Sequence, residues 1–267
     1  MKVFLSADIE GVTGITDWAE ADLTHDTNAE FRERMTAEVV AACEGALAAG
    51  ATELLVKDAH WTGRNLYAER LPREAKLLRG WSGHPYSMVQ GLDATFHAAL
   101  FVGWHSAGGR GGNPLAHTLS SSRLRGIEVN GVWASEFLLH VYAAALERVP
   151  VAFVSGDEEL CAEVRSFDPG IATVAVTRGT GAATLARHPA EARDAIRAEV
   201  ERALAGPLRV APAPLPERFD VRVVRKDARD AYRASFYPGA RLVDATTVGF
   251  ETTDWFEVLR LLQFVTH

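Results

Sequence analysis

The sequence predicts an α/β fold with a mostly parallel central sheet covered by helices, and with a small C-terminal α/β subdomain. Two observations carry this prediction. In the first part of the 267-residue chain, short apolar runs alternate with helical stretches, which is typical of β-α-β units. Residues 208–216 are rich in proline, so they cannot continue a helix and indicate a linker before the last segment.

The N-terminal elements follow from local patterns. Lys2–Ala7 is a short, continuous apolar run, as expected of a strand that is buried on both faces. Residues 29–49 are rich in alanine and glutamate, and Gly50 follows them at a position where helices commonly end, so we predict a helix there. The next strands are predicted at residues 54–56 and 98–103.

The middle of the chain contains a hairpin signal. Residues 125–133 turn on Asn130-Gly131, which is a strong signal for a two-residue turn between antiparallel strands. A helix is predicted over residues 135–147, followed by strands at 151–154 and 173–177 with helices between and after them.

After the proline-rich segment, the pattern predicts a strand at residues 219–224, a helix, a strand at 241–246 and a final amphipathic helix from Asp254. We therefore expect two units. Residues 1–207 form the main α/β domain, which holds the candidate site described below, and residues 217–267 form a small α/β subdomain packed on it.

Composition and charge exclude some classes of function. Hydrophobic residues make up 48% of the chain and charged residues 24%, which is ordinary for a globular protein with a real core. The formal charge is -7 and no window is dominated by basic residues, which argues against a nucleic-acid partner. The N-terminal apolar run is too short for a signal peptide, and no stretch is long enough to span a membrane. We expect a cytoplasmic protein with no membrane partner.

The two cysteines, Cys43 and Cys161, each lie in a stretch that is predicted to be a buried helix, where cysteine usually acts as a small hydrophobic residue. Two cysteines cannot form a cysteine-rich zinc site. Any metal ion must therefore be bound by histidine and carboxylate side chains.

Residues of these types stand directly after four of the apolar runs. They are Asp8 and Glu10 after the first run, Asp58 and His60 after the second, His105 after the third and Asp157 after the fourth. The carboxyl ends of parallel strands lie along one edge of a sheet, where ligands bind, so we expect the first five of these side chains to meet. Carboxylate and imidazole together suit Zn²⁺, Mn²⁺ or Co²⁺.

Asp8 and Glu10 are two residues apart, so in an extended segment their side chains share a face. That spacing lets one carboxylate bridge two ions while the other binds one of them. An aspartate at a strand end often only caps a turn, and a single histidine is more often a surface or core residue than a ligand. The combination of His60 and His105 with the acidic pair favours a metal site over these separate explanations.

Two further residues complete the candidate set. Glu136 lies near the start of the helix that follows the hairpin, where a carboxylate is also favoured by the helix dipole alone. His117 lies downstream of His105 across a glycine-rich loop, from where a general acid or base can reach the site.

Other motifs have simpler explanations. The glycines of residues 108–112 lack the lysine and hydroxyl of a phosphate-binding loop, so we expect a mobile loop. Asp58 is expected to orient His60 rather than bind metal, and Asp157 is either a helix cap or such an orienting residue. No serine-hydrolase elbow and no His-Glu-x-x-His helix occur. No convergent partners can be inferred for the remaining histidines, which are His25, His84, His97, His140, His188 and His267.

Taken in order, these segments resemble a known family, the binuclear zinc D-aminopeptidases named after a bacterial dipeptide-transport operon. The resemblance covers nearly the whole chain. Its most specific parts are Ser6-Ala7-Asp8-Ile9-Glu10-Gly11 at the N-terminus and Ser87-Met88-Val89-Gln90-Gly91-Leu92-Asp93 further on. The other matching pieces are Gly14, Lys57-Asp58-Ala59-His60, Asn65-Leu66, Phe101-Val102-Gly103-Trp104-His105, His117, Glu136, Val154-Ser155-Gly156-Asp157 and Thr246-Thr247.

The resemblance implies a binuclear zinc site, with manganese or cobalt as alternative metals. Asp8 would bridge the two ions, and the remaining protein ligands would be Glu10, His60, His105 and Glu136. His117 matches a family histidine that lies beside the metals and acts in catalysis. The family also forms large homo-oligomeric rings whose active sites face an internal cavity, which implies short peptides as substrates.

The activity implied is that of a metal-dependent aminopeptidase that removes the N-terminal residue, a D-amino acid, from short peptides. A water that bridges two zinc ions would be acidified and attack the scissile carbonyl. One ion would polarise that carbonyl, the other would hold the free α-amine, and His117 would move the proton or stabilise the oxyanion. Lys57 departs from the family, since a small amide residue is expected there, and so does the flexible loop of residues 108–112; both are expected to border the substrate pocket.

Two other functions remain open at this point. A two-metal phosphoesterase uses a similar set of ligands, but it needs a basic clamp for phosphate, and the nearest candidates, Lys57, Arg64 and Arg110, form no compact motif. A metal-containing peptide-binding protein without turnover is the alternative from a different class.

Overall fold

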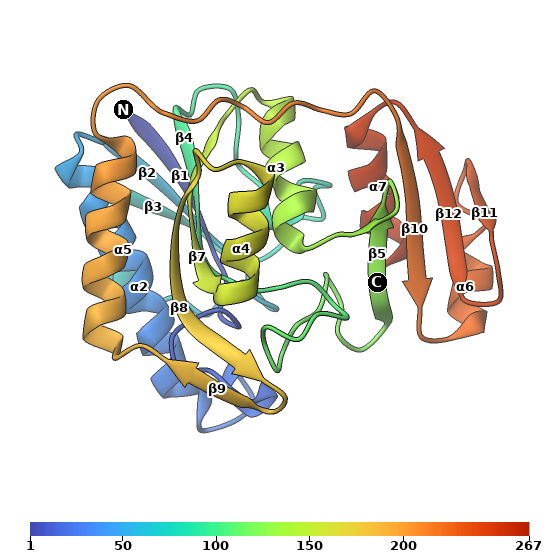
Figure 1. Ribbon diagram of the computed structural model, residues 1–267, viewed down its shortest axis with the longest axis horizontal. Helices are drawn as coiled ribbons and strands as arrows, with labels where there is room; N and C mark the ends of the chain where they lie inside the picture. The colour runs from blue at the N-terminus through green and yellow to red at the C-terminus, as the bar shows by residue number, and fades with distance from the viewer. Residues whose placement is uncertain (267) are drawn as a thin grey trace.

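The structure, a computed structural model that describes residues 1–266, contains two β-sheets with helices packed on them (Figure 1). His267, for which the sequence suggested no role, lies outside the described residues. The larger sheet has seven strands in the order β3-β2-β1-β4-β7-β8-β9. Its strands are β1 (Lys2–Ala7), β2 (Glu53–Asp58), β3 (Ala75–Leu78), β4 (Ala98–Trp104), β7 (Val151–Asp157), β8 (Ala172–Thr180) and β9 (Ala183–Ala186).

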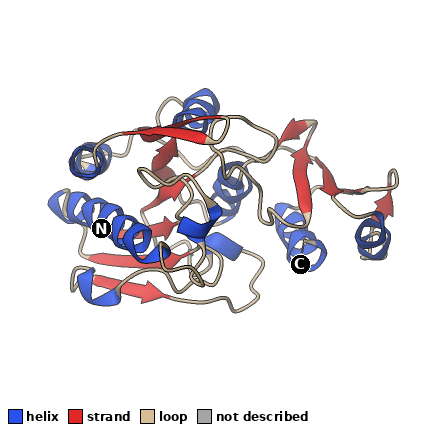
Figure 2. Cartoon of the chain, turned by 90° about the horizontal axis from the view of Figure 1, so that it is seen from below, coloured by secondary structure: helices blue, strands red, loops and turns tan. Residues whose placement is uncertain are grey.

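All neighbouring pairs in this sheet are parallel except β8 and β9, which are antiparallel. The central strands are apolar on both faces, and every residue of β4 and β7 is buried. Helices cover both faces: α2 and α5 pack together on one side, and α3 and α4 lie on the other (Figures 1 and 2). The predicted mostly parallel α/β fold is confirmed.

Several helices begin at residues whose side chains cap them. Ser135 accepts a hydrogen bond from Leu138 N–H at the start of α3, and Asp157 does the same from Leu160 N–H at the start of α4. Gly50 has φ +93° just beyond α2, as a helix-ending glycine requires. The helices are α1 (Trp18–Ala21), α2 (Asn28–Ala48), α3 (Glu136–Leu146), α4 (Glu158–Phe167), α5 (Pro189–Leu204), α6 (Ala228–Ala234) and α7 (Trp255–Val265), with 3₁₀ turns η1 (Ala68–Arg70) and η2 (Ser87–Val89).

The smaller sheet is antiparallel and has the order β11-β12-β10-β5-β6. Its strands are β5 (Leu124–Val129), β6 (Val132–Trp133), β10 (Phe219–Arg225), β11 (Ala240–Leu242) and β12 (Thr247–Thr252). The predicted hairpin forms β5 and β6, and both turn residues have positive φ, 51° at Asn130 and 80° at Gly131.

The strand predicted at residues 241–246 is wrong in extent. The Asp244 carboxylate accepts hydrogen bonds from the N–H groups of Thr246 and Thr247, at 2.8 and 2.9 Å, and so closes a turn. The chain therefore forms two short strands, β11 and β12, instead of one.

The linker is present, since residues 205–218 contain no helix or strand and run across the molecule from α5 to β10 (Figure 1). The smaller sheet is not built from the C-terminal segment alone, because β5 and β6 pair with β10 from the other side of the linker. The division into residues 1–207 and 217–267 stays a prediction. No helix within residues 1–266 has the length and apolar character needed to cross a membrane.

The order in which the chain adds strands to the sheet reverses at β1. The chain proceeds from β1 outward to β2 and β3, and then returns to add β4 on the opposite side of β1. In an open parallel sheet, such a point creates a crevice at the carboxyl ends of the two strands. The last residue of β1, Ala7, lies opposite Asp58 in β2 and Val102 in β4. The three strands therefore end close to one another, and the loops that follow them meet.

One buried carboxylate of α2 predicts a pH-dependent stability. Glu38 is 1% exposed, its Oε1 accepts a hydrogen bond of 2.9 Å from Thr13 N–H, and its Oε2 has no partner among the described residues. Burial raises the pKa of Glu38 from 4.5 to about 7. The folded state therefore holds this proton more tightly than the unfolded chain, so the stability that it contributes is lost as the pH rises from about 4.5 to 7.

Glu38→Gln keeps an acceptor for Thr13 and removes the ionisation. From one pKa unit being worth about 1.4 kcal/mol, we expect the stability of Glu38→Gln relative to wild type to increase by roughly 2–3 kcal/mol between pH 5 and pH 8. Urea unfolding at both pH values measures this difference. Glu44→Gln, at an exposed position of the same helix, is the control. An equal pH response in Glu38→Gln and wild type would contradict the assignment.

Candidate metal centre

Asp8 and Glu10 lie in a tight turn after β1, which differs from the extended segment that the sequence suggested. Val12 N–H donates to Ile9 O at 3.0 Å, and Gly11 N–H donates to Gly103 O at 2.9 Å. A Cβ atom on Gly11 would lie 1.8 Å from the carbonyl oxygen of Trp104, so only glycine allows the turn to pack this closely on β4.

This turn still directs both carboxylates toward His60, which follows β2. His60 Nδ1 lies 3.3 Å from Asp8 Oδ1 and 3.0 Å from Glu10 Oε2. All three side chains are buried. The prediction that the ends of β1 and β2 bring these residues together is therefore met by the geometry.

The other oxygen of Asp8 faces a second group of residues. His105, directly after β4, places Nε2 at 3.5 Å from Asp8 Oδ2 and at 3.3 Å from Glu136 Oε2. Glu136 is the first residue of α3 and is buried like His105. Asp8 thus stands between two clusters, with one oxygen toward His60 and the other toward His105.

Backbone carbonyls fix the orientation of both histidine rings. His60 Nε2 lies 2.9 Å from Ala21 O, and His105 Nδ1 lies 3.0 Å from Ser106 O. Each carbonyl accepts the ring N–H, so the other ring nitrogen faces the carboxylates and becomes a metal ligand once its proton is lost. Asp58 was expected to orient His60; it does not contact the ring, which the carbonyl of Ala21 fixes, and it acts on the loop that carries His60. No sequence pattern marks a backbone carbonyl for this role.

Asp58 instead holds the loop that carries His60. Its Oδ2 accepts hydrogen bonds from Asn65 N–H at 2.6 Å and Leu66 N–H at 2.8 Å, and its Oδ1 accepts one from Asn65 Nδ2 at 2.9 Å. The same Asn65 amide donates to His60 O at 2.7 Å. Asp58 and Asn65 therefore position the main chain of His60.

Asp58→Ala would leave these buried N–H groups without an acceptor. Because each unsatisfied buried group costs about 1–3 kcal/mol, we expect the free energy of unfolding to fall by roughly 3 kcal/mol and zinc to bind more weakly. Urea unfolding and zinc titration measure the two effects. Asp93→Ala is a matched control, since Asp93 bonds Thr95 in the same manner at an exposed site, and it should lose less than about 1 kcal/mol. Equal losses in both variants would refute the role of Asp58.

The segment between His105 and His117 is tied to the site by two residues. Asp157 serves both roles that the sequence left open, because Oδ1 caps α4 and Oδ2 accepts Ser106 N–H at 2.7 Å. Asn113, which no sequence pattern marks, donates from Nδ2 to Glu10 O at 2.7 Å. The glycine loop is anchored at its end by a 2.9 Å hydrogen bond from Gly179 N–H to Gly112 O. Nothing local to Asn113 signals this long-range contact.

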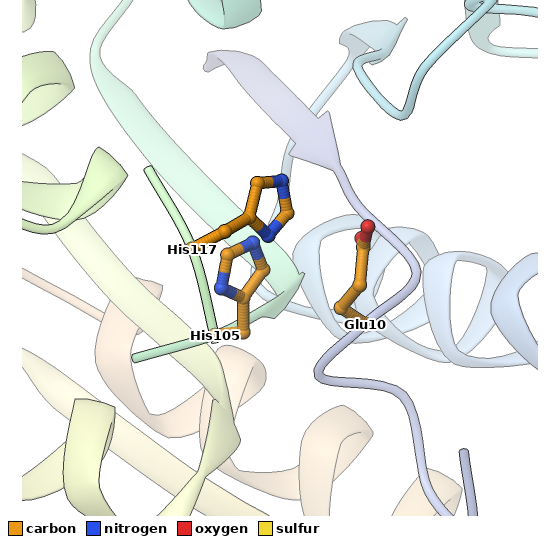
Figure 3. Close-up of side chains that lie close together, drawn as sticks. All are labelled: Glu10, His105 and His117. Atoms are coloured by element: carbon orange, nitrogen blue, oxygen red, sulfur yellow. The ribbon is translucent and has the colours of Figure 1, made fainter. Parts of the chain in front are cut away.

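His117 lies beside the cluster without the close carboxylate contacts of the other two histidines. Its ring stacks on that of His105, with centroids 4.5 Å apart and an interplanar angle of 11°. Figure 3 shows both rings facing the carboxylate of Glu10. His117 Nδ1 lies 3.0 Å from Leu115 O, and Nε2 lies 3.9 Å from Glu136 Oε1. The three side chains in Figure 3 also offer ligand atoms within 4.8 Å of one another.

The concentration of carboxylates makes this site attract positive charge. Burial, together with the charge of Glu10, raises the pKa of Asp8 to about 8. Burial opposes protonation of His60 and His105, but the facing carboxylates outweigh it and raise both pKa values well above the usual range. Burial likewise opposes ionisation of Glu136, yet His105 lowers its pKa to about 2. Without metal, protons on the imidazoles balance the acidic groups, and a metal cation would replace them.

The pKa of His117 shifts in the opposite direction. Burial lowers it, and the charge of the stacked His105 lowers it further. The neutral form of His117 is therefore favoured, with a free lone pair on Nε2, since Nδ1 donates its proton to Leu115 O.

The residues fit a pair of metal ions. Three buried atoms have no hydrogen-bond partner among residues 1–266: Asp8 Oδ2, Glu10 Oε2 and His105 Nε2. His60 Nδ1 lies 3.0 Å from Glu10 Oε2, but the two groups are not oriented for a hydrogen bond. A buried polar atom without a partner lowers the stability of the folded protein unless a bound ion or ligand contacts it. Two ligand sets that share Asp8, one with Glu10 and His60 and one with His105 and Glu136, each lie within 4.8 Å. Imidazole and carboxylate donors suit zinc.

A cavity of about 730 Å³ opens onto this cluster. Its walls come from the loops after the parallel strands, from α3, and from Leu259 and Leu262 of α7 in the C-terminal segment. Three histidines that the sequence left without partners, His25, His84 and His140, also line it. His140 follows Glu136 by one helical turn, so the two side chains share a face of α3. This spacing is the sequence pattern from which a place for His140 near the site could have been predicted.

Lys57 does not line the cavity, contrary to the expectation that it borders the pocket. Its Nζ donates to Asp58 O at 2.6 Å and Gly80 O at 2.7 Å, and it lies 4.0 Å from the centre of the Trp81 ring. Burial lowers the pKa of Lys57 to about 8. Lys57 thus supports Trp81, which does line the cavity. The loop of residues 108–112 also lies outside the lining set.

Comparison with known proteins agrees with this fold and identifies the family. A family model described as D-aminopeptidase matches residues 1–264. A D-aminopeptidase of Bacillus subtilis (strain 168) is 31% identical over 268 residues, which span 100% of this chain and 97% of that protein. A solved structure, described as the Zn-dependent D-aminopeptidase DppA from Bacillus subtilis, a self-compartmentalizing protease, superimposes with a TM-score of 0.92 at 30% identity and covers 100% of this chain and 97% of its own. The chain therefore belongs to the D-aminopeptidase family and is a metal-dependent aminopeptidase, as the sequence predicted.

Proposed function

We propose that the protein binds two zinc ions per chain and removes the N-terminal residue, a D-amino acid, from short peptides. The observation that carries this proposal is the position of Asp8, whose two oxygens face His60 and His105 on opposite sides. A carboxylate shared in this way is suited to bridge two ions. The relative from Bacillus subtilis, described as Zn-dependent, supports zinc over manganese or cobalt.

In this proposal, Asp8, Glu10 and His60 would hold one ion, and Asp8, His105 and Glu136 would hold the other. When bound, zinc supplies Lewis-acid activation of the scissile carbonyl and of the attacking water. The enclosing protein holds these ligands rigidly, since backbone carbonyls fix both imidazoles and Asn113 fixes the main chain of Glu10.

His117 is the proposed proton carrier. Its Nε2 is unprotonated in the favoured neutral form and faces the cluster, so it accepts a proton from the attacking water and returns it to the departing amine. The contacts at Leu115 and the stacked ring of His105 fix the direction of Nε2 during this transfer.

The assembly and location belong to the same proposal. The structural relative is described as a self-compartmentalizing protease. Exposed aromatic side chains on this chain, among them Phe236 and Phe264 at 69% exposure each, favour contact with further subunits. A large homo-oligomer that encloses its active sites would admit only short peptides. A cytoplasmic location stays a prediction from the sequence.

The experiment that tests this function is turnover of paired D- and L-alanyl anilides by purified protein, with metal quantified in the same preparation. We expect hydrolysis of the D substrate and about two zinc ions per chain. Two ions with only L activity would keep the metal site and overturn the stereochemistry. Hydrolysis of an aryl phosphate in place of either anilide would favour the phosphoesterase, and retention of peptide without any product would favour a binding protein.

A further inference from the structure

A short polar segment that follows His117 in the sequence forms one wall of the cavity. It consists of Ser120, Ser121, Ser122 and Arg123, all of which line the cavity. Arg123 is the one lysine or arginine among the lining residues of the described chain, whereas four carboxylates line it: Asp8, Glu10, Asp22 and Glu136. Three of these carboxylates belong to the metal cluster, and Arg123, the one permanently charged cation among the described residues of the cavity, lies outside that cluster.

The backbone of this wall is anchored at both ends. Leu119 N–H donates to Glu136 Oε1 at 2.8 Å, which ties the wall to the metal cluster. On the other side, Lys226 N–H donates to Arg123 O at 2.9 Å and Lys226 Nζ donates to Ser121 O at 2.7 Å. The segment is folded tightly, since Arg123 N–H reaches Ser120 Oγ at 3.3 Å. Arg123 is thus held at a fixed place relative to Glu136.

The Arg123 side chain has no carboxylate within 4.0 Å in the part of the chain that the structure describes, although arginines elsewhere, such as Arg110 and Arg178, lie at that distance from glutamates. Guanidinium groups bind carboxylates through paired hydrogen bonds, and hydroxyl groups add further donors. An exposed arginine that lines a cavity next to three serines is suited to an anionic group of a ligand.

We propose that Arg123 and the adjacent serine hydroxyls bind the free C-terminal carboxylate of the substrate. This inference rests on the proposed function and names its substrate class, peptides short enough for both ends to lie in one cavity. A free short peptide carries an ammonium group at one end and a carboxylate at the other, which matches the acidic cluster and the cation of the cavity. The volume, about 730 Å³, is typical of sites that enclose small molecules.

The test compares two peptides that differ only at the C-terminus, D-alanyl-glycine and D-alanyl-glycinamide. The measured quantity is the ratio of kcat/KM for the acid to kcat/KM for the amide. We expect wild type to favour the acid, and Arg123→Gln to lower the ratio by about tenfold to a hundredfold, because a charge-assisted hydrogen bond to the carboxylate is lost. Arg123→Lys should retain part of the preference.

Arg125→Gln is the matched control, because Arg125 is also exposed, lies two residues further along and is not among the residues that line the cavity. Its ratio should equal that of wild type. An Arg123→Gln ratio equal to wild type, an equal fall in Arg125→Gln, or a wild-type enzyme without preference for the acid would overturn this inference while leaving aminopeptidase activity intact. Failure of wild type to hydrolyse either peptide would overturn the proposed function itself.

Discussion

His105→Ala is expected to lower the bound zinc and to abolish activity. His105 Nε2 is buried, has no hydrogen-bond partner in residues 1–266 and lies between Asp8 at 3.5 Å and Glu136 at 3.3 Å. Loss of an outer partner of a metal ligand typically costs 10–100-fold in metal affinity or activity, so loss of the ligand itself should exceed about a hundredfold in kcat/KM. His60→Ala should have the same effect through the other cluster.

Metal analysis after gel filtration and the kinetics of D-alanyl anilide hydrolysis measure these effects. His25→Ala is the control for metal content, because His25 lines the same cavity but belongs to neither ligand set. We expect wild-type zinc in His25→Ala and at most one ion per chain in His105→Ala. Full zinc content in His105→Ala would exclude His105 as a ligand.

His117→Ala is expected to separate metal binding from turnover. The ring lies 3.9 Å from Glu136 at its nearest carboxylate contact, farther than the corresponding distances of His60 and His105. If His117 transfers protons, its removal should lower kcat by about 10²–10⁴-fold, which is the usual contribution of general acid–base catalysis. The zinc content should match that of wild type.

Metal analysis and the pH dependence of kcat decide this case. In the variant, the limb of the pH profile that reports deprotonation of His117 should disappear, since no other group would replace it. Loss of zinc from His117→Ala would show that His117 is a ligand, as its position next to Glu10 and His105 also allows.

The fold was predictable where local patterns decide it. The apolar run of β1, the glycine after α2 and the Asn130-Gly131 turn each specify their own element, and each element formed with nearly the expected bounds. The sheet to which the hairpin belongs was not predictable. Its strand β5 pairs with β10, which lies about ninety residues later in the chain, and no short sequence pattern specifies such a distant partner. The strand at residues 241–246 failed because the turn at Asp244 depends on side-chain hydrogen bonds.

The candidate site was predictable because parallel strands bring their carboxyl ends together, so residue types after β1, β2 and β4 sufficed to group Asp8, Glu10, His60 and His105. The groups that fix these side chains were not predictable. The carbonyl of Ala21 orients His60, and Asn113 holds the main chain of Glu10, in both cases across loops whose path depends on the whole fold.

We propose that Asp8 would bridge two zinc ions, and anomalous diffraction at the zinc absorption edge, from a crystal of the purified protein, locates any bound zinc. We expect two peaks on either side of the Asp8 carboxylate, one beside Glu10 and His60 and the other beside His105 and Glu136. A single peak, or peaks away from Asp8, would contradict this proposal.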